Sequence, residues 1–335
     1  MTKKKESGMS NSFFNTARVN KNDEFYTKLS DIEKELSHYS DKFKNKIVYC
    51  NCDDPYRSNF IKYFALNFKF LGLKQLVATC YKHPDVDDSS FENVSDKPIK
   101  WVYNGEQIEG QNYPDLTKAI VTDLEGDGDF RSNECLSVLK KCDIVVTNPP
   151  FSLFRDMISL LNEYNKQFLL IGNQNAITYT ELFPLFLKDK MWLGYNTNKS
   201  LFFEVPSNYY LSKNSVIEDN KKYVKVPAIT WFTNIEHSKR NENIIIFKKY
   251  NETEYPTYDN YNAINVDKVK DIPCNYKGIM GVPITFMNKY NPKQFEIIGH
   301  MATTKVTEYN FGYPYINGKK KYARVIIRNR KPQLD

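Results

Sequence analysis

The chain has 335 residues, enough to form a substantial hydrophobic core in one large domain or two. It carries 47 Lys and Arg against 40 Asp and Glu, a net charge of +7, together with 24 Tyr and 22 Phe. Cations neutralise phosphates and aromatic rings stack on bases, so a nucleic-acid partner fits this balance, although a solvated Lys-rich surface would give it too. No apolar run is long enough to span a membrane and no signal-peptide pattern is present, which excludes a membrane protein and predicts a cytoplasmic one.

The N-terminal segment, residues 1–28, is expected to precede the main domain. Its first 21 residues are basic and lack apolar periodicity, a pattern typical of a mobile arm. A helix is predicted from Ser30, because Ser30 and Glu33 have the spacing of a capping box.

Strand patterns and helix patterns then alternate along the chain. Strands are predicted in the segments KIVYC, KQLVATC, KAIVTD, DIVVT and KQFLLIG. Helices are predicted in SNFIKYFALNFKFLGL, NECLSVLKKC, FSLFRDMISLL and TELFPLFLKD. This order predicts an α/β fold with a doubly wound, mostly parallel sheet.

Two parts of the sequence depart from this alternation. Residues 84–118 are polar and irregular, and Asn104-Gly105 between β-forming residues predicts a type I′ hairpin that leaves the sheet. After Trp192, the segments KSLFFEVP and VPAITWFTNI predict an antiparallel pair of strands that closes the sheet. We therefore expect a main domain over residues 29–235 and a smaller region over residues 236–335.

The C-terminal segment GKKKYARVIIRNRKP is strongly basic and contains no acidic residue. The alternation of apolar and cationic residues predicts a half-buried strand with a cationic face. Such a face could bind a DNA backbone, or it could protect an edge strand from aggregation, and the pattern leaves both interpretations open. The candidate DNA-binding residues are Lys319, Lys320, Lys321, Arg324 and Arg328.

The cysteines do not predict a metal site. There are six cysteines and four histidines, and Cys50-x-Cys52 lacks the two-residue gap of common zinc sites. In a cytoplasmic protein these thiols are expected to be reduced.

The segment CDIVVTNPPFSLF places an apolar strand directly before two adjacent prolines. Pro149 and Pro150 lack backbone donors, so a central strand cannot continue through them, and the residue before each proline is held extended. The following residues have helical spacing, which predicts a strand, a rigid turn and a helix. In open α/β sheets, ligands bind at such carboxyl ends of strands.

This junction offers two hydrogen-bond acceptors and a flat ring. The Asn148 amide oxygen and the Pro149 carbonyl could accept both hydrogens of an exocyclic amino group, which withdraws the nitrogen lone pair from ring conjugation and makes it nucleophilic. Phe151 could stack on a base, a contact that contributes about 1 to 3 kcal/mol. The alternative is an ordinary turn, in which Asn148 caps the helix and Phe151 enters the core.

Asn148-Pro149-Pro150-Phe151 resembles the catalytic tetrapeptide of amino-group methyltransferases that use S-adenosylmethionine. Six further segments, NDEFYTKLSDIEKEL, IVYCNCDDP, GDGDFRS, YDNYNAINV, KDIP and GVPITF, together with DIVVTNPPFSLF, resemble the EcoRI-type adenine-specific DNA methyltransferase family in the same order and over nearly the whole chain. The resemblance implies methylation of adenine N6 in double-stranded DNA. Base flipping is then required, because N6 cannot meet a methyl donor inside a stacked duplex.

The resemblance also implies roles for individual residues. Asn148 and Pro149 would hold the amino group, Pro150 would complete the rigid turn, and Phe151 would stack on the adenine. Residues 1–28 would include a segment that closes over the cofactor, residues 29–235 the catalytic domain, and residues 236–335 the target-recognition region. The segment implied to close over the cofactor's methionine part contains Phe25, Tyr26 and Thr27, and the residues implied at its amino-acid end are Asn51, Asp53 and Pro55.

The chain departs from the wider methyltransferase superfamily at two places. CNCDDP replaces the usual glycine-rich turn after the first strand, and QLVATCYK lacks a final acidic residue for the ribose. Asp127, Asp129 and Phe130 in the acidic loop EGDGDF are the remaining candidates for the cofactor's adenine and ribose, unless this loop is only a solvated turn.

Three functions therefore stay open from the sequence. The first is a DNA adenine methyltransferase, either solitary or the modification enzyme of a restriction system with a separate endonuclease. The second is an enzyme that methylates RNA adenine or a protein glutamine, and the third is a methyltransferase-like DNA-binding protein without activity. The family suggests a monomer, and a GAATTC recognition site follows only from the family's namesake.

Overall fold

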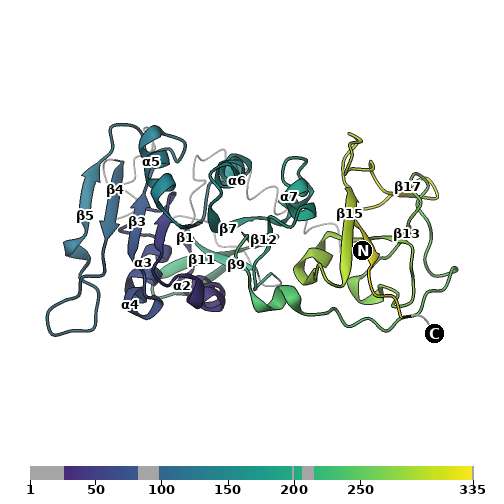
Figure 1. The fold of residues 1–335 in the computed structure, drawn as a ribbon, viewed down its shortest axis with the longest axis horizontal. Coiled ribbons are helices and arrows are strands. Elements are labelled where there is room, and N and C mark those ends of the chain that lie inside the picture. Colours follow the sequence, from purple (N-terminus) through teal and green to yellow (C-terminus); the bar gives the residue numbers. More distant parts are fainter. Residues whose placement is uncertain (1–25, 82–97, 198–199, 206–214, 334–335) are drawn as a thin grey trace. The chain divides into compact units, whose positions relative to one another are not determined.

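A computed structural model describes residues 26–81, 98–197, 200–205 and 215–333. The chain divides into two compact units (Figure 1): residues 1–174 with 198–235, and residues 175–197 with 236–335. The predicted N-terminal arm and the candidate cofactor residue Phe25 lie outside the described residues.

Four parallel strands form the centre of the first unit's main sheet. They are β2 (Ile47–Cys50), β3 (Gln75–Thr79), β6 (Ile144–Thr147) and β7 (Gln167–Asn173), in the spatial order β3-β2-β6-β7. Nearly every residue in them is buried. Such continuous apolar runs are typical of parallel strands that are covered on both faces.

Antiparallel strands extend this sheet on both sides. β4 (Ile99–Tyr103) pairs with β3, and β5 (Ile120–Asp123) pairs with β4. On the other side, β12 (Ile229–Thr233) pairs with β7. The sheet is therefore mixed, and the prediction of a mostly parallel sheet holds only for its centre.

The predicted hairpin at Asn104-Gly105 is wrong. β4 ends at Tyr103 and belongs to the sheet, and its antiparallel partner β5 begins only at Ile120. Of the two turn residues only Gly105 has a positive φ, +92°, whereas a type I′ turn requires positive φ at both. β4, the strand before Asn104, forms its backbone hydrogen bonds with β3. Turn residues carry no information about such a pairing with a more distant segment.

Helices cover both faces of the main sheet (Figure 1). α2 (Leu29–Leu36), α3 (Asn59–Leu66) and α4 (Phe68–Leu71) share one hydrophobic core with the sheet residues Val48 and Ile144. On the opposite face lie α5 (Asn133–Lys141) and α6 (Phe154–Glu163). The ring of Phe154 in α6 lies 5.0 Å from that of Phe232 in β12.

The two strands predicted to close the sheet as a pair lie in different sheets. β9 (Leu201–Val205) pairs with β1 (Tyr26–Thr27) and β11 (Lys221–Val226), and β11 also pairs with β10 (Ser215–Glu218). The pairing prediction was wrong because the two strands differ in burial. β12 is buried throughout, as a strand covered on both faces is, and it joins the main sheet beside β7. β9 alternates between buried and partly exposed residues, as a strand covered on one face does.

The capping box predicted at Ser30 is also absent. α2 begins at Leu29, so Ser30 lies inside the helix, and Lys28 at the cap position makes no side-chain capping bond. Only the position of the helix was predicted correctly.

The second unit is built around a four-stranded sheet in the order β13-β14-β18-β15. Its strands are β13 (Ile264–Asn265), β14 (Ile279–Pro283), β15 (Phe295–Met301) and β18 (Arg324–Asn329). The unit also contains α7 (Phe183–Leu187), β8 (Trp192–Leu193) and the hairpin of β16 (Tyr315–Ile316) with β17 (Lys319–Lys320).

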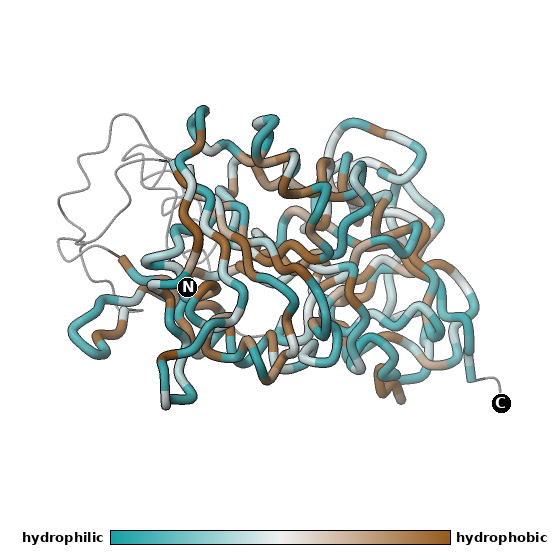
Figure 2. Tube along the Cα trace, turned by 60° about the vertical axis from the view of Figure 1, so that its left-hand side comes forward, coloured by the Kyte–Doolittle hydropathy of each residue, from teal (hydrophilic) through white to brown (hydrophobic). Residues whose placement is uncertain are grey.

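A strand is present in the basic C-terminal segment, as predicted, but it is not half-buried: β18 is a central strand of its sheet. It pairs with β14 on one side and β15 on the other, and all its residues except Arg328 are buried. Hydrophobic stretches, drawn in brown, alternate with hydrophilic ones, drawn in teal, along the chain (Figure 2). Across the described ranges, no helix is both long and apolar enough to cross a membrane.

Candidate functional site

The order of the parallel strands creates a topological switch point between β2 and β6. The chain leaves β2 to form β3 on one side, whereas β6 pairs with β2 on the other. Ligands of open α/β sheets bind at such a switch point, outside the carboxyl ends of the strands. Residues 51–58 follow β2 and residues 148–153 follow β6, so both predicted segments lie at this position.

The predicted strand, turn and helix at the double proline are confirmed. β6 ends at Thr147, a short 3-10 helix spans Phe151–Leu153, and α6 begins at Phe154. The Leu153 amide donates to the Pro150 carbonyl at 2.9 Å, which closes the turn. Asn148 is partly exposed at the strand end, whereas Pro149 is buried beside it.

The two phenylalanines after the prolines have different environments. Phe154 is 2% exposed and packs in the interior. Phe151 is partly buried and packs against the edge of the core that includes α3. Because Phe154 fills the core position, Phe151 is left partly accessible to solvent.

Asp53 joins the loop after β2 to the end of β6. Its Oδ1 accepts a hydrogen bond from the Ser58 hydroxyl at 2.6 Å, and its Oδ2 accepts one from the Thr147 hydroxyl at 2.5 Å. Its amide donates to the Thr79 carbonyl at 3.3 Å, at the end of β3. Since Thr147 directly precedes Asn148, these bonds fix the candidate cofactor loop and the Asn-Pro-Pro turn to each other.

Burial changes the protonation of this carboxyl. Asp53 is 5% exposed, and desolvation raises its pKa from 3.8 to about 6, although the hydroxyls of Ser58 and Thr147 oppose the shift. The protonated form therefore stabilises the fold at low pH, and this contribution is lost as the pH rises from about 4 through about 6. A cation placed beside Asp53 would favour its ionised form.

We expect Asp53→Asn to stabilise the free protein, and more so at high pH. The gain in the free energy of unfolding should be about 1 to 1.5 kcal/mol larger at pH 8 than at pH 5, because the buried carboxylate is ionised at the higher pH. Urea denaturation at both values measures it. A gain that does not differ between pH 5 and pH 8 would contradict the raised pKa.

Two further polar atoms at this edge are buried. Asn51 and Thr27 are 2% and 3% exposed, and neither the Asn51 Oδ1 nor the Thr27 Oγ1 has a hydrogen-bond partner among the described residues. The Asn59 side chain donates to the Thr27 carbonyl at 2.8 Å, which holds β1 beside α3. Buried acceptors of this kind are rare without a ligand or water, so these residues fit a site for a polar small molecule.

Two other residues predicted at the cofactor, Pro55 and Tyr26, belong to the loop after β2 and to β1. Pro55 is buried in the loop after β2. Tyr26 is partly exposed, and the Arg57 guanidinium lies over its ring, 4.3 Å from the centroid. An arginine stacked on this ring ties β1 to the same loop.

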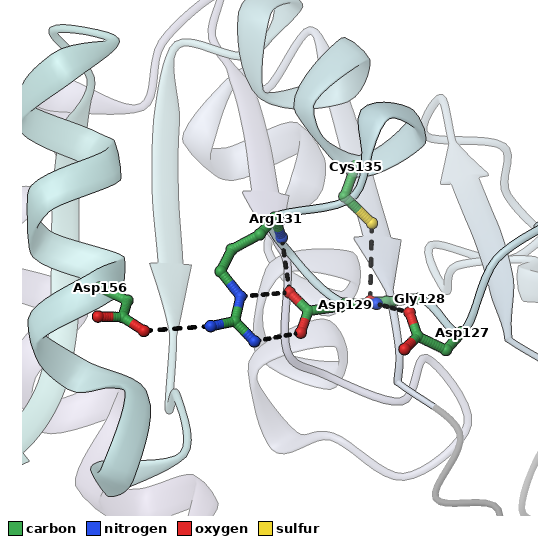
Figure 3. A network of polar contacts seen from close by, with 6 residues as sticks. All are labelled: Asp127, Gly128, Asp129, Arg131, Cys135 and Asp156. Carbon is green, nitrogen blue, oxygen red and sulfur yellow. Dashed lines mark hydrogen bonds and ion pairs between the residues drawn. The ribbon is translucent and has the colours of Figure 1, made fainter.

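The acidic loop after β5 is held by a network of polar contacts (Figure 3). Gly128 has φ +80°, and a Cβ at this position would lie 2.2 Å from the Cys80 carbonyl oxygen. The Gly128 carbonyl also accepts a weak hydrogen bond from the buried Cys135 thiol of α5, with a distance of 3.6 Å between the two heavy atoms. The loop therefore lies directly against the end of β3 and the start of α5.

The three predicted residues of this loop differ in exposure. Asp127 is exposed, and its Oδ1 accepts from the Asp129 amide at 3.0 Å. Asp129 is partly buried, and Phe130 is buried, with 4% exposed. Only Asp127 and Asp129 thus present polar atoms to a ligand.

Arg131 neutralises Asp129 and links it to α6 (Figure 3). Its Nε and Nη2 donate to the Asp129 carboxylate at 2.9 and 2.6 Å, and its Nη1 donates to Asp156 of α6 at 3.1 Å. The hydrogen bonds from Arg131 lower the pKa of Asp129, which keeps the carboxylate ionised. The loop is thereby joined to the helix that follows the Asn-Pro-Pro turn.

The predicted cationic face of the C-terminal segment is only partly exposed. Arg324 is 5% exposed; its Nε donates to the Asn265 side chain at 3.1 Å, and its Nη2 to Asp267 at 3.3 Å. Arg328 is exposed and pairs with Glu296 at 3.5 Å. The expectation that both arginines face solvent is therefore wrong for Arg324. Lys319 and Lys320 are exposed and Lys321 partly so.

Sequence reasoning missed the residues that connect the predicted ones. Ser58 is the N-cap of α3, which its position before the helix could have indicated. Thr147 and Arg131 carry no such local signal, because their partners Asp53 and Asp156 are distant in the sequence.

Comparisons with known proteins identify a family that matches this chain. The family described as "Adenine-specific methyltransferase EcoRI" matches residues 13–330. The chain is 44% identical to the Type II methyltransferase M.EcoRI of Escherichia coli, over 96% of this chain and 98% of that protein. It is 40% identical to the Type II methyltransferase M.MpnI of Mycoplasma pneumoniae, over 95% of this chain and 98% of that protein. No solved structure matches significantly.

Proposed function

The chain belongs to the EcoRI family of adenine-specific methyltransferases, and from this premise we propose how its own residues carry out the reaction. It is a DNA adenine methyltransferase of the kind found in restriction-modification systems. The substrate is the N6 amino group of an adenine in double-stranded DNA, flipped out of the helix.

S-adenosylmethionine is the proposed cofactor, and when bound it supplies an electrophilic methyl group. Asp53 and Asn51 would hold its amino-acid end: a buried carboxylate suits an ammonium group, and the buried Asn51 Oδ1 lacks a partner among the described residues. Thr27 would close this end of the site from β1. Asp127 and Asp129 would contact the ribose or adenine, with Arg131 fixing the Asp129 carboxylate.

Asn148 and Pro149 would activate the target amino group. The Asn148 Oδ1 and the Pro149 carbonyl would accept its two hydrogens, which localises the lone pair on N6. The nitrogen then forms its bond to the methyl carbon as the bond between that carbon and sulfur breaks, and one amino proton leaves to solvent. No residue with a shifted pKa is needed for this step.

The hydrogen bond between Asp53 and Thr147 is the observation that supports this arrangement most strongly. At 2.5 Å it couples the loop proposed to hold the cofactor to the turn proposed to hold the base, across the switch point of the sheet. Transfer requires donor and acceptor to be held within about 3 to 3.5 Å of each other, and this bond fixes the two halves of the site.

The finer assignments form part of the same proposal. The sheet would be a doubly wound methyltransferase sheet within a catalytic domain over residues 29–235, with residues 236–335 as the recognition region. Residues 175–197 group with the second unit in the structure, so the recognition region would include them. The enzyme would act as a cytoplasmic monomer alongside a separate cognate endonuclease.

Transfer of a labelled methyl group from S-adenosylmethionine tests the substrate class. We expect incorporation into duplex DNA and none into single-stranded RNA or protein. Incorporation into RNA or protein alone would overturn the proposed substrate. Cofactor binding without transfer to any of the three would instead indicate an inactive DNA-binding relative.

Phe151→Ala should weaken retention of the flipped base. The partly exposed Phe151 ring is proposed to stack on the adenine, and loss of a stacked base costs about 1 to 3 kcal/mol, or roughly 5- to 150-fold in the flipped population. With 2-aminopurine at the target position, fluorescence should rise on binding to the wild-type enzyme and rise much less with the variant. Phe70→Ala, at a ring that is 82% exposed on α4, is a matched control. Equal emission from Phe151→Ala and wild type would remove Phe151 from this role.

A further inference from the structure

The second unit contains a short hairpin with a fixed tip. β16 and β17 pair antiparallel, with Tyr315 opposite Lys320 and Ile316 opposite Lys319. The turn residues Asn317 and Gly318 have φ values of +50° and +69°, as a type I′ turn requires. The Lys321 amide donates to the Pro314 carbonyl at 2.8 Å, so the ladder continues beyond the two strands.

Asp259 holds the tip from outside the hairpin. Its two carboxylate oxygens accept hydrogen bonds from the backbone amides of Asn317 and Gly318 at 2.9 and 2.8 Å. The Asp259 amide in turn donates to the Tyr315 carbonyl at 2.9 Å. Three bonds to one residue give the tip a defined position, although its side chains are exposed.

The two faces of the hairpin have different surroundings. Ile316 is 7% exposed and packs in the hydrophobic core of the second unit with Tyr258 and Ile326. The opposite face carries Tyr315 and Lys320, and the Lys320 ammonium lies over the Tyr313 ring at 3.1 Å from its centroid. Continuing the register places Tyr322, which is 87% exposed, opposite Tyr313.

All the charged side chains of the hairpin are cationic. Residues 313–323 contain Lys319, Lys320 and Lys321 and no acidic residue. The carboxylate at the tip, Asp259, is occupied by backbone amides. The exposed side chains of the hairpin include Lys319, Lys320 and Tyr322, and cations beside an aromatic ring match the phosphates and sugars of a nucleic acid.

We infer that the Tyr313–Tyr322 hairpin is a DNA-docking ribbon that enters the major groove of the substrate duplex. The inference rests on the proposed function and adds a recognition element to it. A two-stranded ribbon fits the major groove of B-form DNA, whereas the major groove of an RNA duplex is too deep and narrow. Lys319 and Lys320 contact phosphates. The side-chain amide of Asn317 at the tip contacts a base edge, for which adenine is the matching base.

The phosphate contacts are tested by a salt titration of DNA affinity with the full-length enzyme. For Lys319→Gln/Lys320→Gln, fluorescence anisotropy on a duplex should show the slope of log affinity against log salt reduced by about one unit for each phosphate that is no longer neutralised. At 0.15 M salt, removal of each cation should weaken binding about fivefold, whatever the DNA sequence. Lys293→Gln is the matched control. Lys293 is exposed and lies just before Phe295, where β15 begins, whereas Met301 at the other end of β15 pairs with Arg324, which follows the hairpin in the sequence. A slope equal to that of Lys293→Gln and wild type overturns the phosphate contacts.

The base contact is tested separately with Asn317→Gly, which keeps a residue suited to positive φ but removes the amide. We expect this variant to lose about 5- to 100-fold in discrimination at one base pair of the site, with an unchanged salt slope. Unchanged discrimination at every position overturns the base contact. Equal losses on duplex DNA and duplex RNA in the lysine variant overturn the choice of the major groove.

These binding assays do not require turnover, so the two proposals fail separately. An active DNA methyltransferase whose hairpin variants bind DNA like wild type refutes the hairpin role alone. A wild-type protein that binds DNA through the hairpin but transfers no methyl group refutes the proposed reaction alone.

Discussion

Asn148→Ala is expected to abolish methyl transfer and to leave binding nearly intact. The Asn148 oxygen at the end of β6 is proposed to accept a hydrogen from the adenine amino group, an interaction that strengthens as the nitrogen becomes a nucleophile. Loss of such a preorganised group lowers kcat by at least about 100- to 1000-fold. Affinities for S-adenosylmethionine and duplex DNA should stay within about tenfold, because they reflect the ground state. Single-turnover transfer and calorimetric cofactor binding measure the two effects.

Asn148→Asp provides the control for this variant. The aspartate keeps an acceptor oxygen of the same size at the same position, so it should retain clearly more transfer than the alanine variant. Near-wild-type turnover in Asn148→Ala, with the protein folded and binding its cofactor, would contradict the catalytic role.

Gly128→Ala is expected to disrupt the acidic loop and with it the proposed cofactor site. A Cβ at this position would lie 2.2 Å from the Cys80 carbonyl oxygen, and φ is +80°. Because the obstacle is backbone at the end of β3, it cannot be relieved by rotation of a side chain. We expect a loss of about 3 kcal/mol or more in the free energy of unfolding, and a loss of S-adenosylmethionine affinity in the protein that remains folded.

Gly110→Ala separates the effect of the clash from that of φ. Gly110 has a φ of +73°, similar to that of Gly128, but a Cβ there would meet nothing within 4 Å. It should therefore lose only about 1 to 2 kcal/mol and retain cofactor affinity. Equal losses of stability in the two variants would show that the close approach to Cys80 has no effect.

The parts of the site that were predicted from the sequence depend on local chemistry. Two adjacent prolines end a strand whatever the rest of the chain does, and this fixed the strand, turn and helix around Asn148. The apolar runs of β2, β3, β6 and β7 likewise required burial on both faces, which predicted a parallel sheet in this part of the chain.

The parts that were missed depend on contacts between distant segments. Nothing near Thr147 indicates that its hydroxyl donates to Asp53, 94 residues earlier. The alternation in β18 suggested a cationic face, but Arg324 is buried because Asn265 and Asp267 from β13 and the loop after it bind its guanidinium. Strand pairing was predicted wrongly for β9 for the same reason, since its partner β11 cannot be identified from the β9 sequence alone.

The central proposal is that Asn148-Pro149-Pro150-Phe151 holds a flipped adenine in duplex DNA while its N6 amino group is methylated. Its most direct test is mass spectrometry of the nucleosides released from duplex DNA after incubation with the enzyme and S-adenosylmethionine labelled in the methyl group. We expect all of the label in N6-methyldeoxyadenosine for the wild-type enzyme, and at least about 100-fold less of it from Asn148→Ala. Label in a methylated cytosine, or equal N6-methyldeoxyadenosine from the two proteins, would contradict it.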